Sequence, residues 1–390
     1  MGKKSKYFWL TGILTVIVIL VIGWKGTSRN QSSDISAKLI APTAQVLIEG
    51  YDRAEGPKPI LFPDDQGPHP DYQTEWWYYT GNLDTPDGHH FGYQLTFFRR
   101  ALLPPDQITP RSSDWGTTQV YLAHFALTNV ADQSHTVFER LERGAAGLAG
   151  AQVNPFQVWL DDWNVQQIDP GVYKLSATAG DIQLKLKLVD EKGPVLHGDQ
   201  GYSQKGPDPG NASYYVSLTR LATDGSIMIG ERTFPVSGYG WMDHEWSTSA
   251  LTSNQVGWDW FSIQLDNDSE LMVFQIRQAD GSIDPYSSGT WIAPDGSTKH
   301  LNKDDFSIEV GNTWTSPHTR AKYPSSWKIA VPSEDLNLEI LPYVADQELN
   351  VTYNYWEGAV KITGTQAGRS VKGNGYVELT GYAGSMGGEF

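Results

Sequence analysis

Hydrophobic and polar residues alternate with a period of two along most of the chain, which is the pattern of β-strands with one buried face. Residues 75–83 lead into the turn Thr85-Pro-Asp-Gly88, and residues 91–100 return from it, as in a β-hairpin. Further strand-like segments follow at 120–130, 182–189, 214–221 and 227–233. No window has a convincing helical period, although residues 132–144 could hold a short turn of helix. The pattern predicts an all-β, mainly antiparallel protein.

The second half of the chain repeats the first. Two pairs of segments align: 76–84 with 258–266, and 236–243 with 371–378. The first pair opens each half with an aromatic hairpin, and the second closes it with the pattern Val-x-Gly-x-Gly. Glycines inside a strand suit the tight bend and close backbone approach of a barrel corner. We therefore expect two related barrel-like units, at residues 75–246 and 256–385.

The N-terminal residues have the composition of a membrane anchor. Three lysines among the first six residues precede residues 7–24, which carry no charge and are about long enough to cross a bilayer. No small-residue cleavage site follows, so we expect residues 1–25 to be an uncleaved signal anchor rather than a cleaved signal peptide. The lysines should stay in the cytoplasm and leave the bulk of the chain outside it, in the periplasm or at the cell surface. Residues 26–74 then form a polar tether and a proline-rich, irregular lead-in.

Charge and composition narrow the possible partners. The formal net charge is −16, and the 24 basic and 45 acidic residues beyond position 29 leave a balance of −21 there. Such an acidic body repels phosphate backbones, so we expect no nucleic-acid partner. The absence of cysteine excludes disulfides, thiolate metal sites and a lipoprotein anchor. Fifteen Trp and 19 Tyr favour strands and apolar pockets.

One segment, Trp241-Met-Asp-His-Glu-Trp246, concentrates carboxylates, an imidazole and indoles. On a strand, His244 and Trp246 share one face while Asp243 and Glu245 share the other, so either pair could line a cavity. The second unit has Glu378-Leu-Thr-Gly381 at the matching position, so we expect the chemistry on the first closing strand. The candidate catalytic residues are His244, Trp246, Asp259, Asp243 and Glu245. The candidate ligand-binding residues are Trp258, Trp260, Trp241, Glu75, Trp77 and His124.

Several of these candidates have two interpretations. Asp259 lies in an otherwise apolar row of its strand, where its pKa should rise and it could hold a proton near neutral pH. Alternatively it is a structural residue bonded to backbone amides or to an arginine such as Arg277. His124 is either a ligand contact or a satisfied barrel histidine. Glu75 is either a pocket acid or a charge at a strand end.

Other chemistries fit the sequence less well, and we predict neither a metal nor a cofactor. Consecutive strand residues cannot all face one ion, and no His-x-His or His-x-x-x-His spacing supports a zinc site. The Gly-x-Gly pairs lack a following helix that could bind phosphate. Ser247 and Ser249 lie near His244, but the chain has no Gly-x-Ser-x-Gly elbow of a serine hydrolase.

The chain resembles the AttH-like family, bacterial predicted secreted hydrolases related to carotenoid 1,2-hydratase. Six motifs carry the resemblance: Glu75-Trp-Trp-Tyr78, Tyr93-Gln-Leu-Thr-Phe-Phe-Arg99, Met242-Asp-His-Glu-Trp246, Gly257-Trp-Asp-Trp-Phe261, Tyr355-Trp-Glu-Gly358 and Gly375-Tyr-Val-Glu-Leu-Thr-Gly-Tyr382. The resemblance covers about residues 60–385 and implies two tandem lipocalin-like β-barrels. It also implies cofactor-free addition of water to a terminal isoprenoid double bond. The family's His-x-Trp pair then falls on His244 and Trp246, and its Asp proton donor on Asp259.

Three functions remain open at this point. The first is a hydratase- or cyclase-like enzyme acting on an apolar isoprenoid or lipid, with a neutral Asp259 beside His244. The second is a lipocalin-like carrier that binds an apolar ligand without chemistry, which aromatic residues without a proton donor would favour. The third and weakest is carbohydrate recognition, because Trp platforms and paired carboxylates also suit sugars.

We expect a reporter enzyme fused after Arg29 to be active only outside the cytoplasm, because the lysine-flanked apolar segment should direct the chain beyond it across the membrane. The same fusion without residues 7–24 is the control and should stay in the cytoplasm. Reporter activity confined to the cytoplasm in the full fusion would show that the orientation is wrong. A mature protein that begins near Thr27 would show instead that the segment is cleaved.

Overall fold

The computed structural model describes residues 49–109, 113–249 and 251–386, all of which belong to one unit of the chain. The membrane segment expected at residues 7–24 lies outside the described residues. Within the described part, no helix has the length and apolar character needed to cross a bilayer. The only helical elements there are short 3₁₀ turns: η2 (Asp64–Gln66), η3 (Pro105–Gln107), η4 (Lys303–Asp305) and η5 (Pro332–Glu334).

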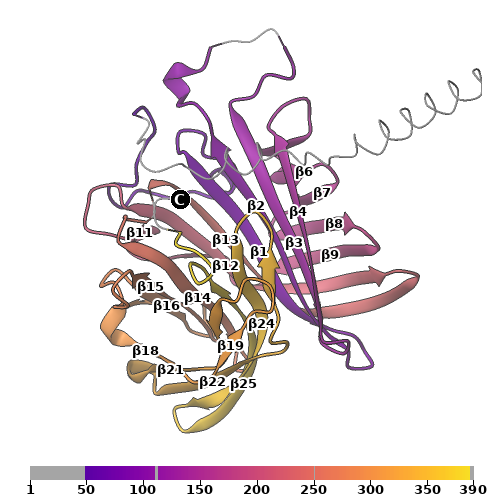
Figure 1. Cartoon of the computed structure of the whole chain (residues 1–390), viewed down its shortest axis with the longest axis vertical. Coiled ribbons are helices and arrows are strands. Elements are labelled where there is room, and N and C mark those ends of the chain that lie inside the picture. Colours follow the sequence, from indigo (N-terminus) through magenta and orange to yellow (C-terminus); the bar gives the residue numbers. More distant parts are fainter. Residues whose placement is uncertain (1–48, 110–112, 250, 387–390) are drawn as a thin grey trace, which may run out of the picture. The chain divides into compact units, whose positions relative to one another are not determined.

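The first sheet contains 13 strands and forms the N-terminal barrel (Figure 1). Its strands are β1 (Thr74–Asp84), β2 (His90–Ala101), β3 (Gln119–Asn129), β4 (Ser134–Arg143), β5 (Ala149–Gln152), β6 (Gln157–Leu160), β7 (Trp163–Asp169), β8 (Val172–Ala179), β9 (Ile182–Asp190), β10 (Pro194–Leu196), β11 (Tyr202–Gln204), β12 (Ala212–Ile229) and β13 (Arg232–Ser249). They follow the order β4-β3-β2-β1-β13-β12-β9-β8-β7-β6-β5, and β10 and β11 add to β12. Because β3 and β4 contact β5 and β6, the sheet is nearly closed.

The second sheet contains ten strands and forms the C-terminal barrel. Its strands are β14 (Gln255–Leu265), β15 (Glu270–Gln278), β16 (Ser288–Ile292), β17 (Thr298–Asn302), β18 (Ser307–Val310), β21 (Trp327–Val331), β22 (Leu336–Pro342), β23 (Glu348–Asn350), β24 (Asn354–Gln366) and β25 (Arg369–Leu379). The order is β17-β16-β15-β14-β25-β24-β22-β21-β18, and β23 adds to β24. A separate hairpin joins β19 (Thr313–Thr315) to β20 (Lys322–Pro324).

The chain is therefore all-β, as the alternating pattern predicts. One local expectation is wrong: residues 134–143 form strand β4 and not a turn of helix. The reason is that β4 pairs along its whole length with β3, so ladder hydrogen bonds outweigh the local helical preference.

The repeat seen in the sequence is present in the pairing of the strands. In the N-terminal barrel β1 lies between β2 and β13, and in the C-terminal barrel β14 lies between β15 and β25. Even the register is the same: Tyr79 pairs with Met242, and their repeat equivalents Phe261 and Val377 pair with each other. Asp243 and Glu378 are therefore equivalent positions of the two barrels.

Each barrel is filled by its own hydrophobic core. Large side chains of the N-terminal core include Trp77, Tyr79, Tyr93, Phe97, Phe125 and Trp163. Those of the C-terminal core include Phe261, Trp291, Tyr323, Trp327 and Trp356. Full burial of one such side chain stabilises the fold by about 1.5–3 kcal/mol. The two barrel interiors are thus occupied by the protein's own side chains.

The lead-in at residues 49–73 closes one end of the N-terminal barrel. The indole N–H of Trp77 donates to the carbonyl of Gln66 at 3.1 Å, and the amide of Gln66 donates to the Tyr173 hydroxyl at 2.5 Å. His69 stacks on Trp246 with 3.8 Å between ring centroids. The segment is irregular apart from η2, as its prolines predict, yet it is part of the packed body.

The two barrels pack against each other along a seam, in which repeat-equivalent residues of the two barrels make matching contacts. The side-chain amide of Asn82 donates to the carbonyl of Gly375 at 3.0 Å, and Gln264 donates to the carbonyl of Gly240 at 2.9 Å. Asn82 and Gln264 are repeat equivalents, and so are the two glycines. The other glycine pair of the Val-x-Gly-x-Gly motif is sterically required. A Cβ added at Gly238 would lie 2.1 Å from the backbone carbonyl oxygen of Asn82. A Cβ added at Gly373 would lie 2.0 Å from the backbone carbonyl oxygen of Gln264.

These two amides should contribute measurably to stability. Asn82→Ala should lower the free energy of unfolding by about 1–3 kcal/mol, because it leaves a buried carbonyl without its donor. Gln264→Ala should cost more, since Gln264 also donates to the carbonyl of Thr219. Urea denaturation followed by tryptophan fluorescence measures both. Asn337→Ala, on the exposed side of β22, is the control. Equal stability of Asn82→Ala and this control would contradict the role of the seam.

Candidate active site between the two barrels

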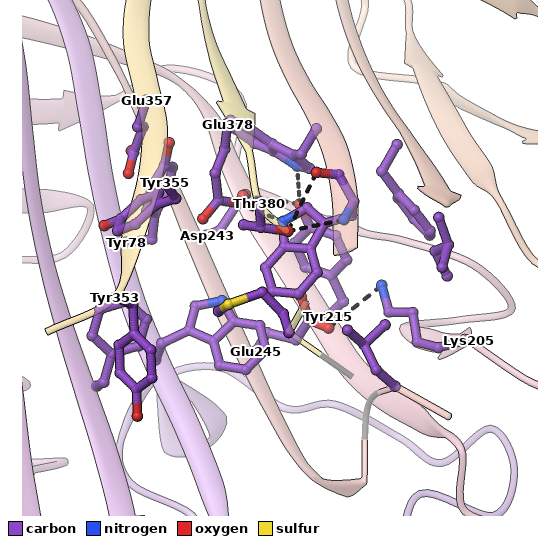
Figure 2. Close-up of a pocket in the computed structure, with 18 of the residues that line it drawn as sticks. Tyr78, Lys205, Tyr215, Asp243, Glu245, Tyr353, Tyr355, Glu357, Glu378 and Thr380 are labelled. Carbon is purple, nitrogen blue, oxygen red and sulfur yellow. Dashed lines mark hydrogen bonds and ion pairs between the residues drawn. The ribbon is translucent and has the colours of Figure 1, made fainter. Parts of the chain in front are cut away.

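A pocket lies between the two barrels, and strands of both barrels form most of its walls (Figure 2). The N-terminal barrel contributes residues of β1, β2, β3, β12 and β13, and the C-terminal barrel contributes residues of β14, β15, β24 and β25. The space amounts to about 980 Å³ with its open mouth included. Aromatic side chains dominate the walls, among them Trp76, Tyr78, Trp258, Trp260 and Tyr353. Its largely apolar walls with a few polar groups are typical of a small-molecule site.

Four carboxyl groups line this apolar pocket. Asp243 and Glu245 come from β13, Glu357 from β24 and Glu378 from β25. Strand alternation places them here, since residues two apart share a face. Glu357 and Glu378 are also direct partners in the β24–β25 register. Asp243, Glu245 and Glu357 are buried, and Glu378 is partly buried.

Asp243 is held by three hydrogen-bond donors. The Trp241 indole donates at 2.6 Å and the Tyr215 hydroxyl at 2.9 Å, and the Ser217 hydroxyl also donates to the same carboxyl. Burial nevertheless raises the pKa of Asp243 to about 7, with these donors offsetting part of the rise. Glu245 is paired as well: it accepts from the Ser213 hydroxyl and lies 3.5 Å from the Lys205 ammonium.

Glu357 and Glu378 have far fewer partners. Glu378 accepts one hydrogen bond, from the Trp258 indole at 2.6 Å, and burial raises its pKa to about 7. Burial and the neighbouring Glu378 raise the pKa of Glu357 well above its usual value, and the hydroxyls of Tyr78 and Tyr355 offset part of this. Neither oxygen of Glu357 receives a hydrogen bond of good geometry from any described residue. Glu357 is therefore a buried acid with a raised pKa that faces the pocket.

His124 lies at the pocket wall, where the ligand-contact interpretation predicts it. Its Nδ1 lies 2.7 Å from the Tyr355 hydroxyl, and its Nε2 lies 3.1 Å from Glu139. The alternative of a satisfied histidine also describes it, because both ring nitrogens have partners. The result is a hydrogen-bonded chain from the partly exposed Glu139 to a pocket-lining tyrosine.

His244, Trp246, Glu75 and Trp77 form a separate cluster, at the barrel end that the lead-in closes. Glu75 Oε1 accepts from His244 Nε2 and from His69 Nδ1, both at 2.8 Å. The His244 ring stacks on Trp77 at 4.9 Å and lies 4.8 Å from Trp246. The sequence prediction that His244 and Trp246 face the N-terminal barrel agrees with this position. Neither lines the pocket between the barrels.

The charges of this cluster balance without a ligand. Burial opposes the ionised form of Glu75, but Arg99 at 2.7 Å and the two histidines hold its pKa well below the usual value. Burial also opposes protonation of His69, but hydrogen bonds to Asp65 and Glu75 outweigh it and raise its pKa. Burial lowers the pKa of His244, which is therefore neutral.

The same residues are the one group in the described chain with metal-ligand types close together. Ligand atoms of His69, Glu75 and His244 lie within 4.8 Å of one another. However, Arg99 already occupies Glu75 Oε2, and both imidazoles already bond to Oε1. A cation would have to displace these hydrogen bonds and share the carboxylate with a guanidinium. The donor set thus fits a hydrogen-bond network better than a metal site.

Asp259 lies in a third place, and the expectation that it serves the same cavity as His244 is wrong. It alternates along β14 with core residues of the C-terminal barrel, whereas His244 faces the N-terminal barrel. Burial raises the pKa of Asp259, as expected, but its carboxyl lies 3.0 Å from Arg277 and also bonds to Gln275 and Tyr382. The alternative interpretation, an Asp bonded to Arg277, describes what the structure shows.

The structure thus divides the predicted site residues into three groups. One is the cluster at the closed barrel end, His244, Trp246, Glu75 and Trp77, and another is Asp259 beside Arg277. Those that line the pocket are Asp243, Glu245, Trp258, Trp260 and His124, with Trp241 directly behind Asp243. Sequence reasoning missed Glu357 and Glu378. The repeat contained the signal for Glu378, because it aligns this residue with Asp243. However, the second unit has no histidine next to this position, so the sequence pattern favoured the first unit alone.

Arg99 should be critical for folding, because it is fully buried and balances the buried Glu75. Arg99→Met should lower the free energy of unfolding by about 3–5 kcal/mol, the usual cost of leaving one partner of a buried ion pair uncompensated. Thermal and urea denaturation measure the loss. The exposed Arg369→Met is the matched control. A loss below about 1 kcal/mol for Arg99→Met would contradict this description of the cluster.

Comparison with known proteins places the chain in a family. The family profile described as AttH-like matches residues 53–382. The crystal structure of an AttH protein from Nitrosomonas europaea is 37% identical to this chain with a TM-score of 0.75, and the match covers 83% of this chain and 97% of that one. Kievitone hydratase from Nectria haematococca has the same fold, with a TM-score of 0.63 at 15% identity over 86% of this chain and 98% of that one.

Distant relatives by sequence are hydratases and dehydratases. Kievitone hydratase of Fusarium solani subsp. phaseoli is 24% identical over 192 residues, or 47% of this chain and 53% of that protein. Dehydratase AsqC of Emericella nidulans is 21% identical over 197 residues, or 48% of this chain and 54% of that protein. The chain spans about half the length of these curated relatives. With a family profile that matches most of the chain and a 37% identical relative of the same fold, this protein belongs to the AttH-like family.

Proposed function

We propose that this protein is a cofactor-free hydratase-like enzyme that adds water to an apolar substrate, or removes it, in the pocket between the barrels. One observation carries the proposal: Glu357 is a buried carboxyl in an aromatic pocket, it receives no hydrogen bond of good geometry from any described residue, and it lies directly opposite a second carboxyl, Glu378. Protonation of an alkene needs a neutral acid that water does not level. The names of the distant relatives, kievitone hydratase and dehydratase AsqC, support the same reaction class.

In the hydration direction Glu357 is the acid. Its pKa, well above the usual value, keeps the proton on the carboxyl at neutral pH. Transfer of this proton to one carbon of an isoprenoid double bond leaves a carbocation on the other carbon and a carboxylate on Glu357. The role assigned to Asp259 from the sequence thus moves to a residue of β24.

Glu378 is the base. With a pKa of about 7 it is substantially ionised at neutral pH, and it lies directly across the strand pair from Glu357. A water molecule whose oxygen attacks the carbocation gives one proton to this carboxylate. Transfer of a proton from Glu378 back to Glu357 restores the starting state, so the cycle needs no external acid or oxidant.

The walls suit such a reaction. Trp76, Trp258 and Trp260 line the pocket, and electron-rich indole rings stabilise positive charge. The rest of the lining is largely aromatic or aliphatic and would hold the hydrocarbon body of an isoprenoid or lipid. We also propose that residues 1–25 anchor the chain in the cytoplasmic membrane with the barrels outside, close to a source of such substrates.

A second candidate function is a lipocalin-like carrier of an apolar ligand. The observation in its favour is that Asp243 and Glu245 already have protein partners, and so do not need a substrate. The barrel interiors are filled, unlike a ligand-holding cup, so a carrier would use the same pocket between the barrels. The two functions differ in whether the bound molecule changes.

Incorporation of ¹⁸O from labelled water tests the proposal. The purified protein should convert at least one member of a panel of terminal-alkene isoprenoids, including kievitone, to a hydrate that carries ¹⁸O, as detected by mass spectrometry. Glu357→Gln should lower the rate at least about 100-fold, because the amide cannot donate the proton. The exposed Glu339→Gln makes the same charge change and should leave the rate unchanged. Binding of panel members without ¹⁸O uptake would favour the carrier.

The rate should also depend on pH in a way that reports the two carboxyls. It should rise as pH increases through about 7, because Glu378 must be ionised to act as the base. At higher pH it should fall, when Glu357 loses its proton. A rate that only decreases with rising pH above 5 would contradict the assignment of Glu378.

A further inference from the structure

The pocket carries an excess of acidic groups that the protein itself does not balance. Among the described residues that line it, four are carboxylic acids and Lys205 is the single lysine or arginine. The Lys205 ammonium already lies 3.5 Å from Glu245 and above the rings of Phe274 and Tyr215. This ion pair accounts for one acid and one base. Three acids remain without a cation: Asp243, Glu357 and Glu378.

The unused acceptor capacity is concentrated at Glu357 and Glu378. Asp243 is saturated by three donors, whereas Glu378 has one and Glu357 has none of good geometry among the described residues. Glu357 is 1% exposed and faces the pocket. A buried carboxyl without a partner is costly, and a cation is the ligand that removes this cost.

Aromatic rings surround the same pair. Figure 2 shows Glu357 beside Tyr355 and Tyr78, and Glu378 beside Asp243. The Trp258 indole, on the neighbouring strand β14, donates to Glu378. Carboxylates within a cage of aromatic faces are the usual surroundings of bound organic ammonium ions. Such an ion would also occupy the position of the carbocation in the proposed reaction.

We infer that the pocket binds hydrophobic ammonium ions, with the cationic group against Glu357 and Glu378 and the apolar part against the tryptophans. This inference rests on the proposed function only in treating the ammonium ion as a stable mimic of the carbocation. The charge imbalance and the open carboxyls support it whether or not the pocket performs chemistry. Amines and quaternary ammonium compounds are then ligands or inhibitors of this protein.

The test compares two probes of the same shape. Benzyltrimethylammonium carries a permanent charge, and neopentylbenzene has carbon in place of its nitrogen. At pH 8 the ammonium ion should bind the full-length protein about tenfold more tightly than the hydrocarbon, a factor typical of a desolvated cation–π contact. Fluorescence of the pocket tryptophans follows both titrations.

The pH dependence provides a second readout. Affinity for the ammonium ion should fall about tenfold between pH 8 and pH 6, because Glu378, with a pKa of about 7, must lose its proton to pair with it. The hydrocarbon should show no such fall. The other titratable and charged groups that line the pocket or act on the pair are Asp243, Glu245, Lys205, His124, Tyr78, Tyr215, Tyr353, Tyr355 and Tyr376.

Variants locate the binding. Glu378→Gln should weaken the ammonium complex about tenfold, because it removes a carboxylate, and leave the hydrocarbon complex unchanged. Glu339→Gln is the control for the change in net charge and should affect neither probe. Equal affinity for both probes at pH 8 would overturn the inference, and so would a failure of the ammonium ion to bind. Neither of these binding results changes the outcome of the ¹⁸O assay, which tests the proposed function independently.

Discussion

The strands at the centre of the two barrels bury both of their faces, and this constraint determines where every functional group lies. On β1, β13, β14 and β25 one row of side chains fills a barrel and the next row faces the other barrel. Neighbouring residues such as Asp243 and His244 therefore end in different environments although they are adjacent in the chain. A dense motif on such a strand is divided between two sites and cannot be one catalytic centre.

The seam between the barrels is also what makes its carboxyls unusual. A row of acids on the outside of a single barrel would be solvated and would have ordinary pKa values. Docking of the second barrel removes this water, and burial is the largest cause of the raised pKa values of Asp243, Glu357 and Glu378. The approximate two-fold relation adds to the effect, because it brings Glu378 close to its repeat equivalent Asp243.

The N-terminal barrel end shows the opposite outcome for a buried acid. Glu75 is fully buried, yet it has a guanidinium at 2.7 Å and two imidazole partners, so its charge is retained. Whether burial raises the pKa of a carboxyl therefore depends on the cations and hydrogen-bond donors around it. The two clusters contain similar residue types, but the cluster at Glu75 is electrostatically complete and the pocket is not.

The sequence by itself contained the alternating pattern, the internal repeat and the division of neighbouring residues between the two faces of a strand. Alternation alone separated His244 and Trp246 from Asp243 and Glu245, and the repeat predicted the equivalent positions of β1 and β14, because strand geometry is local and has a fixed period. Only the tertiary structure decided which face meets which neighbour. It placed Asp259 against Arg277 and gathered Glu357 and Glu378 beside Asp243, across more than 100 residues of chain. No local rule contains this result, since it depends on how two closed sheets pack against each other.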